Sequence, residues 1–112
     1  MPTTTDYNRG AVVLLPFPFS DQSAAKLRPA VVANPIFPSA DLIVVALSSV
    51  ANPLRPGEYQ VQFWREAGLL HPSFVKRAIA SVSSSLVRRS LGNLQSGDLA
   101  QLDAALHTWL AL

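Results

Sequence analysis

The sequence contains no cysteine among its 112 residues. A disulfide framework, a thiolate metal site and a nucleophilic thiol are therefore excluded. Histidine is scarce as well: the two histidines, His71 and His107, lie in separate segments and offer no ligand cluster for a transition metal. We expect the protein to use no metal and no other cofactor.

Long apolar runs are also missing. No stretch approaches the roughly 20 consecutive apolar residues that a membrane-spanning helix requires. The opening segment, Met1 to Arg9, lacks the apolar core of a secretory signal. The sequence thus predicts a cytoplasmic protein with no membrane partner.

Charge of either sign is modest. Nine basic and seven acidic residues give a formal net charge of +2 at pH 7. Most of the basic residues are arginine, whose planar guanidinium contacts phosphate through two donors at once. This bias agrees with a nucleic-acid partner, but many ordinary soluble domains share it. The length fits one domain with one core.

Apolar residues make up 49% of the chain and fall into short runs separated by prolines. Runs rich in Val, Ile, Leu and Phe predict five strands, at Ala11–Leu15, Ala30–Ala33, Leu42–Leu47, Tyr59–Phe63 and Phe74–Val82. Five short strands within about 80 residues favour a closed or half-closed barrel, because an open sheet would leave long unpaired edges.

The apolar period changes near the C-terminus. From Leu99 to Leu110 apolar residues recur at helical spacing, which predicts a helix packed on the barrel. Ser96 is the expected N-cap, and Asp98 places a negative charge in the first turn, where the helix dipole favours it. Before this helix, the consecutive serines Ser83 to Ser85 predict a short helical turn.

Several motifs, taken in order, resemble the MazF/PemK family. The matching segments are Arg9–Asp21, Lys26–Val32, Val45–Ser49, Gly68–Leu70, Pro72–Lys76, Ser85–Arg89 and Leu91–Leu94. The strongest is the Arg-Pro pair at Arg28 and Pro29, which heads an apolar strand. The resemblance implies one MazF/PemK-like toxin domain over residues 1–112. Its fold would be mainly β, a small, strongly bent antiparallel barrel of the Src-homology-3-like, CcdB/PemK type with a C-terminal α-helix.

The resemblance also implies a function, the toxin of a bacterial type II toxin–antitoxin system. Such toxins are homodimeric, sequence-selective endoribonucleases that cut single-stranded RNA without a metal. The ribose 2′-hydroxyl attacks the adjacent phosphorus and leaves a 2′,3′-cyclic phosphate and a 5′-hydroxyl. A cognate antitoxin occupies the RNA groove and blocks cleavage. The partners implied for this chain are therefore single-stranded RNA, an antitoxin and a second copy of itself.

RNA transesterification builds negative charge on a phosphorane, so the site needs a fixed cation and hydrogen-bond donors. Arg28 is the predicted catalytic cation; the alternative is that it pairs with Asp21 at the strand end. Ser48 is the second predicted catalytic residue, because the family usually places a threonine hydroxyl there to hold the scissile phosphate. The alternative for Ser48 is that its hydroxyl forms a hydrogen bond with a nearby backbone group.

Further residues are predicted to bind RNA, namely Lys26, Ser49, His71 and Lys76. Lys26 begins one matched segment beside Arg28, and Lys76 ends another. Ser49 follows Ser48, and His71 lies in a loop before a proline. For His107 an exposed ion pair with Asp103, one helical turn earlier, is the simpler expectation. Two roles are open for the arginines in the second half of the chain: they either contact the RNA phosphates or lie on solvated surface. These residues are Arg65, Arg77, Arg88 and Arg89.

The chain departs from the family where relatives often carry a carboxylate. The loop at Ser23 to Ala25 has no acidic residue, Ser83 stands where aspartate recurs, and Ala11 replaces another acid. The general base is therefore unassigned. Two functions of a different class stay open on the same scaffold, a non-catalytic decoy that binds antitoxin and a CcdB-like gyrase-directed toxin. Retention of Arg28 and Ser48 favours the ribonuclease.

Overall fold

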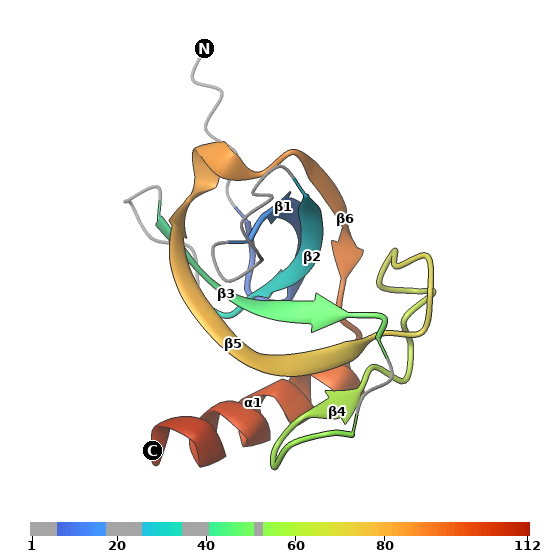
Figure 1. The fold of residues 1–112 in the computed structure, drawn as a ribbon, viewed down its shortest axis with the longest axis vertical. Helices are drawn as coiled ribbons and strands as arrows, with labels where there is room; N and C mark the ends of the chain where they lie inside the picture. Colours follow the sequence, from blue (N-terminus) through green and yellow to red (C-terminus); the bar gives the residue numbers. More distant parts are fainter. Residues whose placement is uncertain (1–6, 18–25, 35–40, 51–52) are drawn as a thin grey trace.

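The computed structural model describes residues 7–17, 26–34, 41–50 and 53–112. The elements in chain order are β1 (Ala11–Pro16), β2 (Leu27–Val32), β3 (Asp41–Ser48), β4 (Tyr59–Gln60), β5 (Phe74–Ser83), the 3-10 turn η1 (Ser84–Leu86), β6 (Arg89–Asn93) and α1 (Ser96–Leu110). The strands form one antiparallel sheet in the order β4-β5-β3-β2-β1-β6. In Figure 1 the long strand β5 bends strongly and the sheet curls into a half-barrel above α1. The predicted mainly β, bent antiparallel fold with a C-terminal helix is confirmed.

The core forms on both faces of the curled sheet, because successive side chains of a strand point to opposite faces. Val12, Val31 and Val45 are opposite one another on β1, β2 and β3 and pack with Leu102 of α1. Their neighbours along each strand form a second cluster, which includes Leu15. All five side chains are fully buried. Burial of an aliphatic side chain of this size contributes about 1.5–3 kcal/mol, so these strands hold the scaffold on which the loops are mounted.

Two strands at the β1 side of the sheet differ from the prediction. β2 begins at Leu27 instead of Ala30, so Arg28 lies within the ladder, opposite Leu15 of β1. The sequence predicts no strand at Arg89–Asn93, where β6 is found. This segment has little apolar character, and it becomes a strand because it pairs with the free edge of β1.

The predicted strand Tyr59–Phe63 is wrong beyond Gln60. The chain turns over residues 62–68 instead of continuing along β5. The backbone N–H groups of Gln62 and Phe63 donate to the two carboxylate oxygens of Asp98, each at 2.9 Å. These bonds direct the backbone away from the ladder and into the turn.

The start of α1 differs from the prediction in one respect. The N-cap is Gln95, which makes no side-chain capping bond, and Ser96 is already helical. Asp98 does lie in the first turn, as predicted, but it is 2% exposed and serves as an acceptor for another segment of the chain. No helix within the described residues is long and apolar enough to cross a membrane.

Two other local predictions had different outcomes. The serine turn is confirmed, because Ser83 Oγ accepts the backbone N–H of Ser85 at the start of η1. The expected ion pair between His107 and Asp103 is not formed in the part of the chain that the structure describes. Asp103 pairs with Arg9 instead, which ties α1 to the residue before β1.

Candidate functional site

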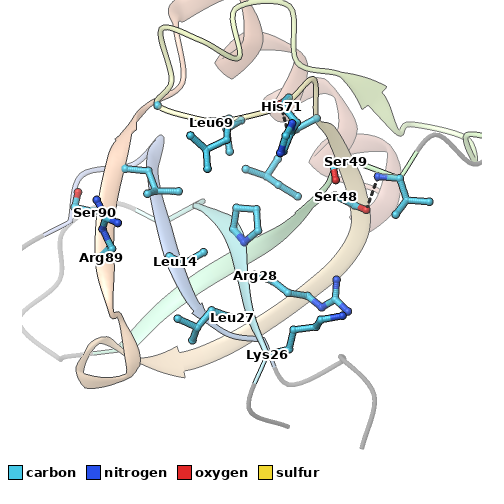
Figure 2. Close-up of a pocket in the computed structure, with 17 residues that line it drawn as sticks. Leu14, Lys26, Leu27, Arg28, Ser48, Ser49, Leu69, His71, Arg89 and Ser90 are labelled. Carbon is cyan, nitrogen blue, oxygen red and sulfur yellow. Dashed lines mark hydrogen bonds between the residues drawn. The ribbon is translucent and has the colours of Figure 1, made fainter. Parts of the chain in front are cut away.

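A cavity of about 460 Å³ lies where β1, β2, β3 and β6 meet the segment of residues 68–73 (Figure 2). Its floor and walls are largely apolar, with contributions from Leu14, Leu27, Pro29, Leu47, Leu69 and Leu91. Its polar lining comes from Lys26, Arg28, Ser48, Ser49, His71, Ser73, Arg89 and Ser90. The structure thus brings five of the six predicted site residues to one cavity, with Lys76 the exception.

Arg28 projects from the second residue of β2, where the ladder with β1 holds its backbone. The residue is half-buried, and no carboxylate within the described residues pairs with it. The sequence also suggested an ion pair between Arg28 and Asp21, but Asp21 lies outside the described residues. Lys26 is exposed and immediately precedes β2. Two cationic residues, Lys26 and Arg28, therefore lie at the start of this strand and line the cavity.

Ser48 is the last residue of β3 and is half-buried. Its Oγ accepts a 3.1 Å hydrogen bond from the backbone N–H of Val50. The alternative considered for Ser48 from the sequence, a hydrogen bond between its hydroxyl and nearby backbone, is therefore present. It uses the oxygen only as an acceptor, so the hydroxyl hydrogen can still be donated to a ligand in the cavity. Ser49 is exposed beside it.

The wall at Gly68–His71 depends on a close approach to β6. Gly68 has a φ of +87°, and a Cβ at this position would collide with the carbonyl group of Leu91. Glycine is favoured here because its backbone is left-handed and because no side chain fits between it and Leu91. At the other end of the wall, Ser73 is 3% exposed and its Oγ donates a 2.8 Å hydrogen bond to the carbonyl oxygen of His71. The exposed His71 side chain is therefore mounted on a backbone held at both ends.

Lys76 lies on β5 and does not line the cavity. Its Nζ is 3.1 Å from Oε1 of Glu58, whose side chain is 2% exposed. The same carboxylate accepts the backbone N–H groups of Arg55 at 2.9 Å and Arg77 at 2.8 Å. Burial raises the pKa of Glu58, but these hydrogen bonds and Lys76 together outweigh burial and bring the pKa below its usual 4.5. In this structure Lys76 therefore serves an ion pair, and its predicted contact with RNA has no support from the geometry.

Arg89 and Ser90 of β6 also line the cavity. The sequence left Arg89 open between phosphate binding and solvated surface, and it did not single out Ser90. Arg89 is opposite Leu14 of β1. Its position follows from the pairing of β6 with β1, which no apolar pattern in the segment signals. The described lining of the cavity therefore contains three cations, Lys26, Arg28 and Arg89, and no carboxylate.

The composition of the lining limits its chemistry. Within the described residues no three or more His, Asp or Glu side chains are grouped so that they could hold a metal ion. Cationic donors above an apolar floor suit an anionic ligand that also carries apolar or aromatic groups. A guanidinium on a strand whose backbone is held in the ladder, together with a hydroxyl donor of the same cavity, can stabilise charge that develops on such a ligand.

Known proteins resemble the chain in sequence pattern and in fold. The family model for the PemK-like, MazF-like toxin of type II toxin–antitoxin system matches residues 8–110. A comparison with curated proteins finds no significant sequence match.

Solved structures with a similar fold include several toxins. An endoribonuclease in complex with its cognate antitoxin, from a mycobacterial species, has a TM-score of 0.74 at 17% identity, covering 95% of this chain and 96% of that chain. The MazE–MazF structure (form II) from Deinococcus radiodurans has a TM-score of 0.74 at 18% identity, covering 96% and 98%. The Mycobacterium tuberculosis toxin MazF-mt6 has a TM-score of 0.71 at 17% identity, covering 91% and 97%. At these identities the likeness shows a shared fold.

Proposed function

The chain belongs to the family of PemK-like, MazF-like toxins of type II toxin–antitoxin systems, and from this membership we propose that it is an endoribonuclease that cleaves single-stranded RNA. The observation that carries the proposal is the cavity, whose described lining has three cations and no carboxylate. RNA supplies the complementary negative charge on its phosphates, and the apolar floor suits unpaired bases. Two of the solved structures with this fold are described as endoribonucleases from mycobacterial species.

The proposed reaction is an internal transesterification without a metal ion. The ribose 2′-hydroxyl loses its proton to a base and attacks the adjacent phosphorus. The bond from phosphorus to the 5′ oxygen breaks, and that oxygen takes up a proton. Arg28 donates to the non-bridging oxygens as charge develops on the phosphorane, and the Ser48 hydroxyl adds a second donor. Lys26, Ser49 and His71 line the same cavity and would hold the RNA on either side of the scissile bond.

We further propose that residues 1–112 act as one toxin domain, as a homodimer in the cytoplasm, under the control of a cognate antitoxin. The fold neighbours include an endoribonuclease in complex with its cognate antitoxin. Near the mouth of the cavity in this chain, Leu70 is 85% exposed and Val50 is 53% exposed. Large apolar side chains left at the surface are typical of an interaction site. Light scattering should give the mass of two chains; a single-chain mass with cleavage intact would contradict a shared groove.

A non-catalytic protein that binds antitoxin is the second candidate. It is favoured by the lack of a carboxylate in the described lining, because relatives often carry acidic residues that this chain replaces. A cationic cavity above an apolar floor would hold an acidic peptide as well as RNA. The gyrase-directed alternative finds no comparable support within the described residues.

One experiment separates these candidates. Purified protein is incubated in EDTA with a pool of single-stranded RNAs, and the cut sites and end groups are mapped. The expected result is cleavage at recurrent short sequences, with 2′,3′-cyclic phosphate and 5′-hydroxyl ends. Protein carrying Arg28→Ala, purified in the same way, excludes a contaminating nuclease. Activity that is lost in EDTA and restored by magnesium would overturn the metal-free mechanism. Antitoxin binding without any cleavage would favour the decoy.

A further inference from the structure

We propose that Arg89 of β6 binds a second RNA phosphate, next to the scissile phosphate that Arg28 contacts. This inference rests on the proposed function and extends it. It assigns a specific contact to an arginine for which the sequence left two roles open, phosphate binding or solvated surface. It also makes β6 one wall of the RNA site.

The register of the sheet places Arg89 across β1 from Pro29, the residue that follows Arg28. Leu14 of β1 is opposite Pro29 on β2 and opposite Arg89 on β6. Residues directly opposite in adjacent strands share a face of the sheet, so these three side chains form one row, and all three line the cavity. Figure 2 shows Arg89 on the far side of Leu14 from Arg28.

The spacing of the strands indicates two separate phosphate contacts. β2 and β6 flank β1, so their backbones lie two inter-strand spacings apart, about 10 Å. Arg28 and Arg89 lie on opposite sides of the apolar row at Leu14 and Pro29. An RNA strand that crosses this row would bring one phosphate to each arginine.

The electrostatics favour an anion on the β6 side. Within the described residues Arg89 makes no ion pair, and the cavity that it lines contains no carboxylate. Lys26 and Arg28 line the same cavity. Cations of like sign around one cavity repel one another, and a ligand that brings more than one negative charge relieves that repulsion.

Arg88 provides a matched control. It precedes Arg89 in the chain, carries the same charge and is likewise exposed. Its guanidinium Nη1 donates a 3.0 Å hydrogen bond to the carbonyl oxygen of Leu86, and it is not part of the described lining of the cavity. Arg88→Ala and Arg89→Ala therefore change the net charge equally, but only the second removes a cation from the cavity.

The first test measures binding apart from cleavage. The probe is a single-stranded RNA selected by its binding to the parent protein. Where that RNA is cleaved, a 2′-deoxy sugar at the scissile nucleotide removes the attacking hydroxyl. For Arg89→Ala we expect about a tenfold loss of affinity at low salt, and a slope of log K against log salt that is about 0.7 shallower. Arg88→Ala should keep the parent slope, and Arg89→Lys should restore it. Equal slopes for Arg88→Ala and Arg89→Ala would overturn the inference, whether or not the parent protein cleaves RNA.

The second test locates the contact. Each phosphate flanking the cut is replaced in turn by an uncharged methylphosphonate. Parent protein should bind one of these substituted RNAs more weakly, and Arg89→Ala should be insensitive at that same position. In cleavage of unmodified RNA, Arg89→Ala should raise KM with little change in kcat, because a flanking contact is equally strong in the ground and transition states. Sensitivity retained at every flanking phosphate would overturn the inference. A parent that binds but does not cleave, with the expected Arg89 effect, would support the inference and contradict the endoribonuclease proposal.

Discussion

Asp98, in the first turn of α1, holds the backbone of Phe63, which lies 35 residues earlier in the chain, through a 2.9 Å hydrogen bond from the Phe63 N–H to Oδ2. Its other oxygen accepts the N–H of Gln62, also at 2.9 Å. These bonds begin the turn over residues 62–68, and the end of that turn, Gly68, enters the wall of the cavity. A buried carboxylate in the helix therefore sets the path of a loop that forms the site.

Replacing Asp98 with alanine should destabilise the fold. The change leaves two backbone N–H groups without their charged acceptor, which costs about 3 kcal/mol of the free energy of unfolding. Urea denaturation measures this loss. Asp103→Ala is the control, because Asp103 pairs with Arg9 through a side chain that is 50% exposed, and its loss should cost less than about 1 kcal/mol. Equal losses in the two variants would contradict the role given to Asp98.

Two glycine substitutions should have opposite effects on thermal stability. Gly68→Ala forces a side chain onto a φ of +87° and into the carbonyl group of Leu91, and should destabilise by about 1–3 kcal/mol or more. Gly97 is the second residue of α1, and an added Cβ there meets nothing within 4 Å. Gly97→Ala should therefore stabilise by up to about 1 kcal/mol. Melting temperatures that shift in the same direction would contradict this geometry.

Replacing Arg28 with alanine should lower the cleavage rate by about 10² to 10³, the usual effect of losing one preorganised donor. Arg28→Lys should recover little, because an ammonium group cannot make the planar two-donor contact to phosphate. Single-turnover cleavage measures the rate, and circular dichroism and light scattering confirm that each variant is folded and assembled. A folded Arg28→Ala protein that cuts at the parent rate would rule out the proposed catalytic cation.

The hydroxyl group of Ser48 should matter more than its size. Ser48→Thr keeps the O–H and should cleave near the parent rate. Ser48→Val has nearly the same shape as threonine without the hydroxyl, and should be slower than Ser48→Thr but faster than Arg28→Ala. Rates measured on the same RNA decide the order. Equal rates for the threonine and valine variants would show that the hydroxyl does not act.

Glu58 should make stability depend on pH in the acid range. Its pKa in the folded protein lies below the usual 4.5, because its backbone hydrogen bonds and Lys76 outweigh the effect of burial. A carboxyl group with a lowered pKa stabilises the fold above its unfolded pKa, and this stability is lost as the pH falls through the folded pKa. The gap in unfolding free energy between parent and Glu58→Gln should therefore be largest above about pH 5 and shrink in acid. Denaturation from pH 3 to 7 measures the gap, and a constant gap would contradict the shift.

Much of the fold follows from local patterns. Apolar runs predicted β1, β3 and β5 nearly to their ends. The residues of β1 and β3 are largely buried, and most apolar residues of β5 are buried or half-buried. The helical period predicted α1, and consecutive serines predicted η1. The motifs resembling MazF/PemK picked out Arg28 and Ser48, whose side chains meet at one cavity because β2 and β3 are neighbours in the sheet.

Other features arise from contacts between segments that are distant in the sequence. β6 exists because β1 has a free edge, and it is this pairing that brings Arg89 to the cavity. After Val61, whose N–H still donates to the carbonyl oxygen of Ser73, the chain leaves β5 because the next two N–H groups donate to Asp98 on the helix. Lys76 pairs with Glu58 and does not line the cavity. Apolar periodicity is a property of neighbouring residues and can be recognised in the sequence. Edge pairing and the partner of a buried carboxylate depend on which distant segments meet in space, so they became visible only in the folded chain.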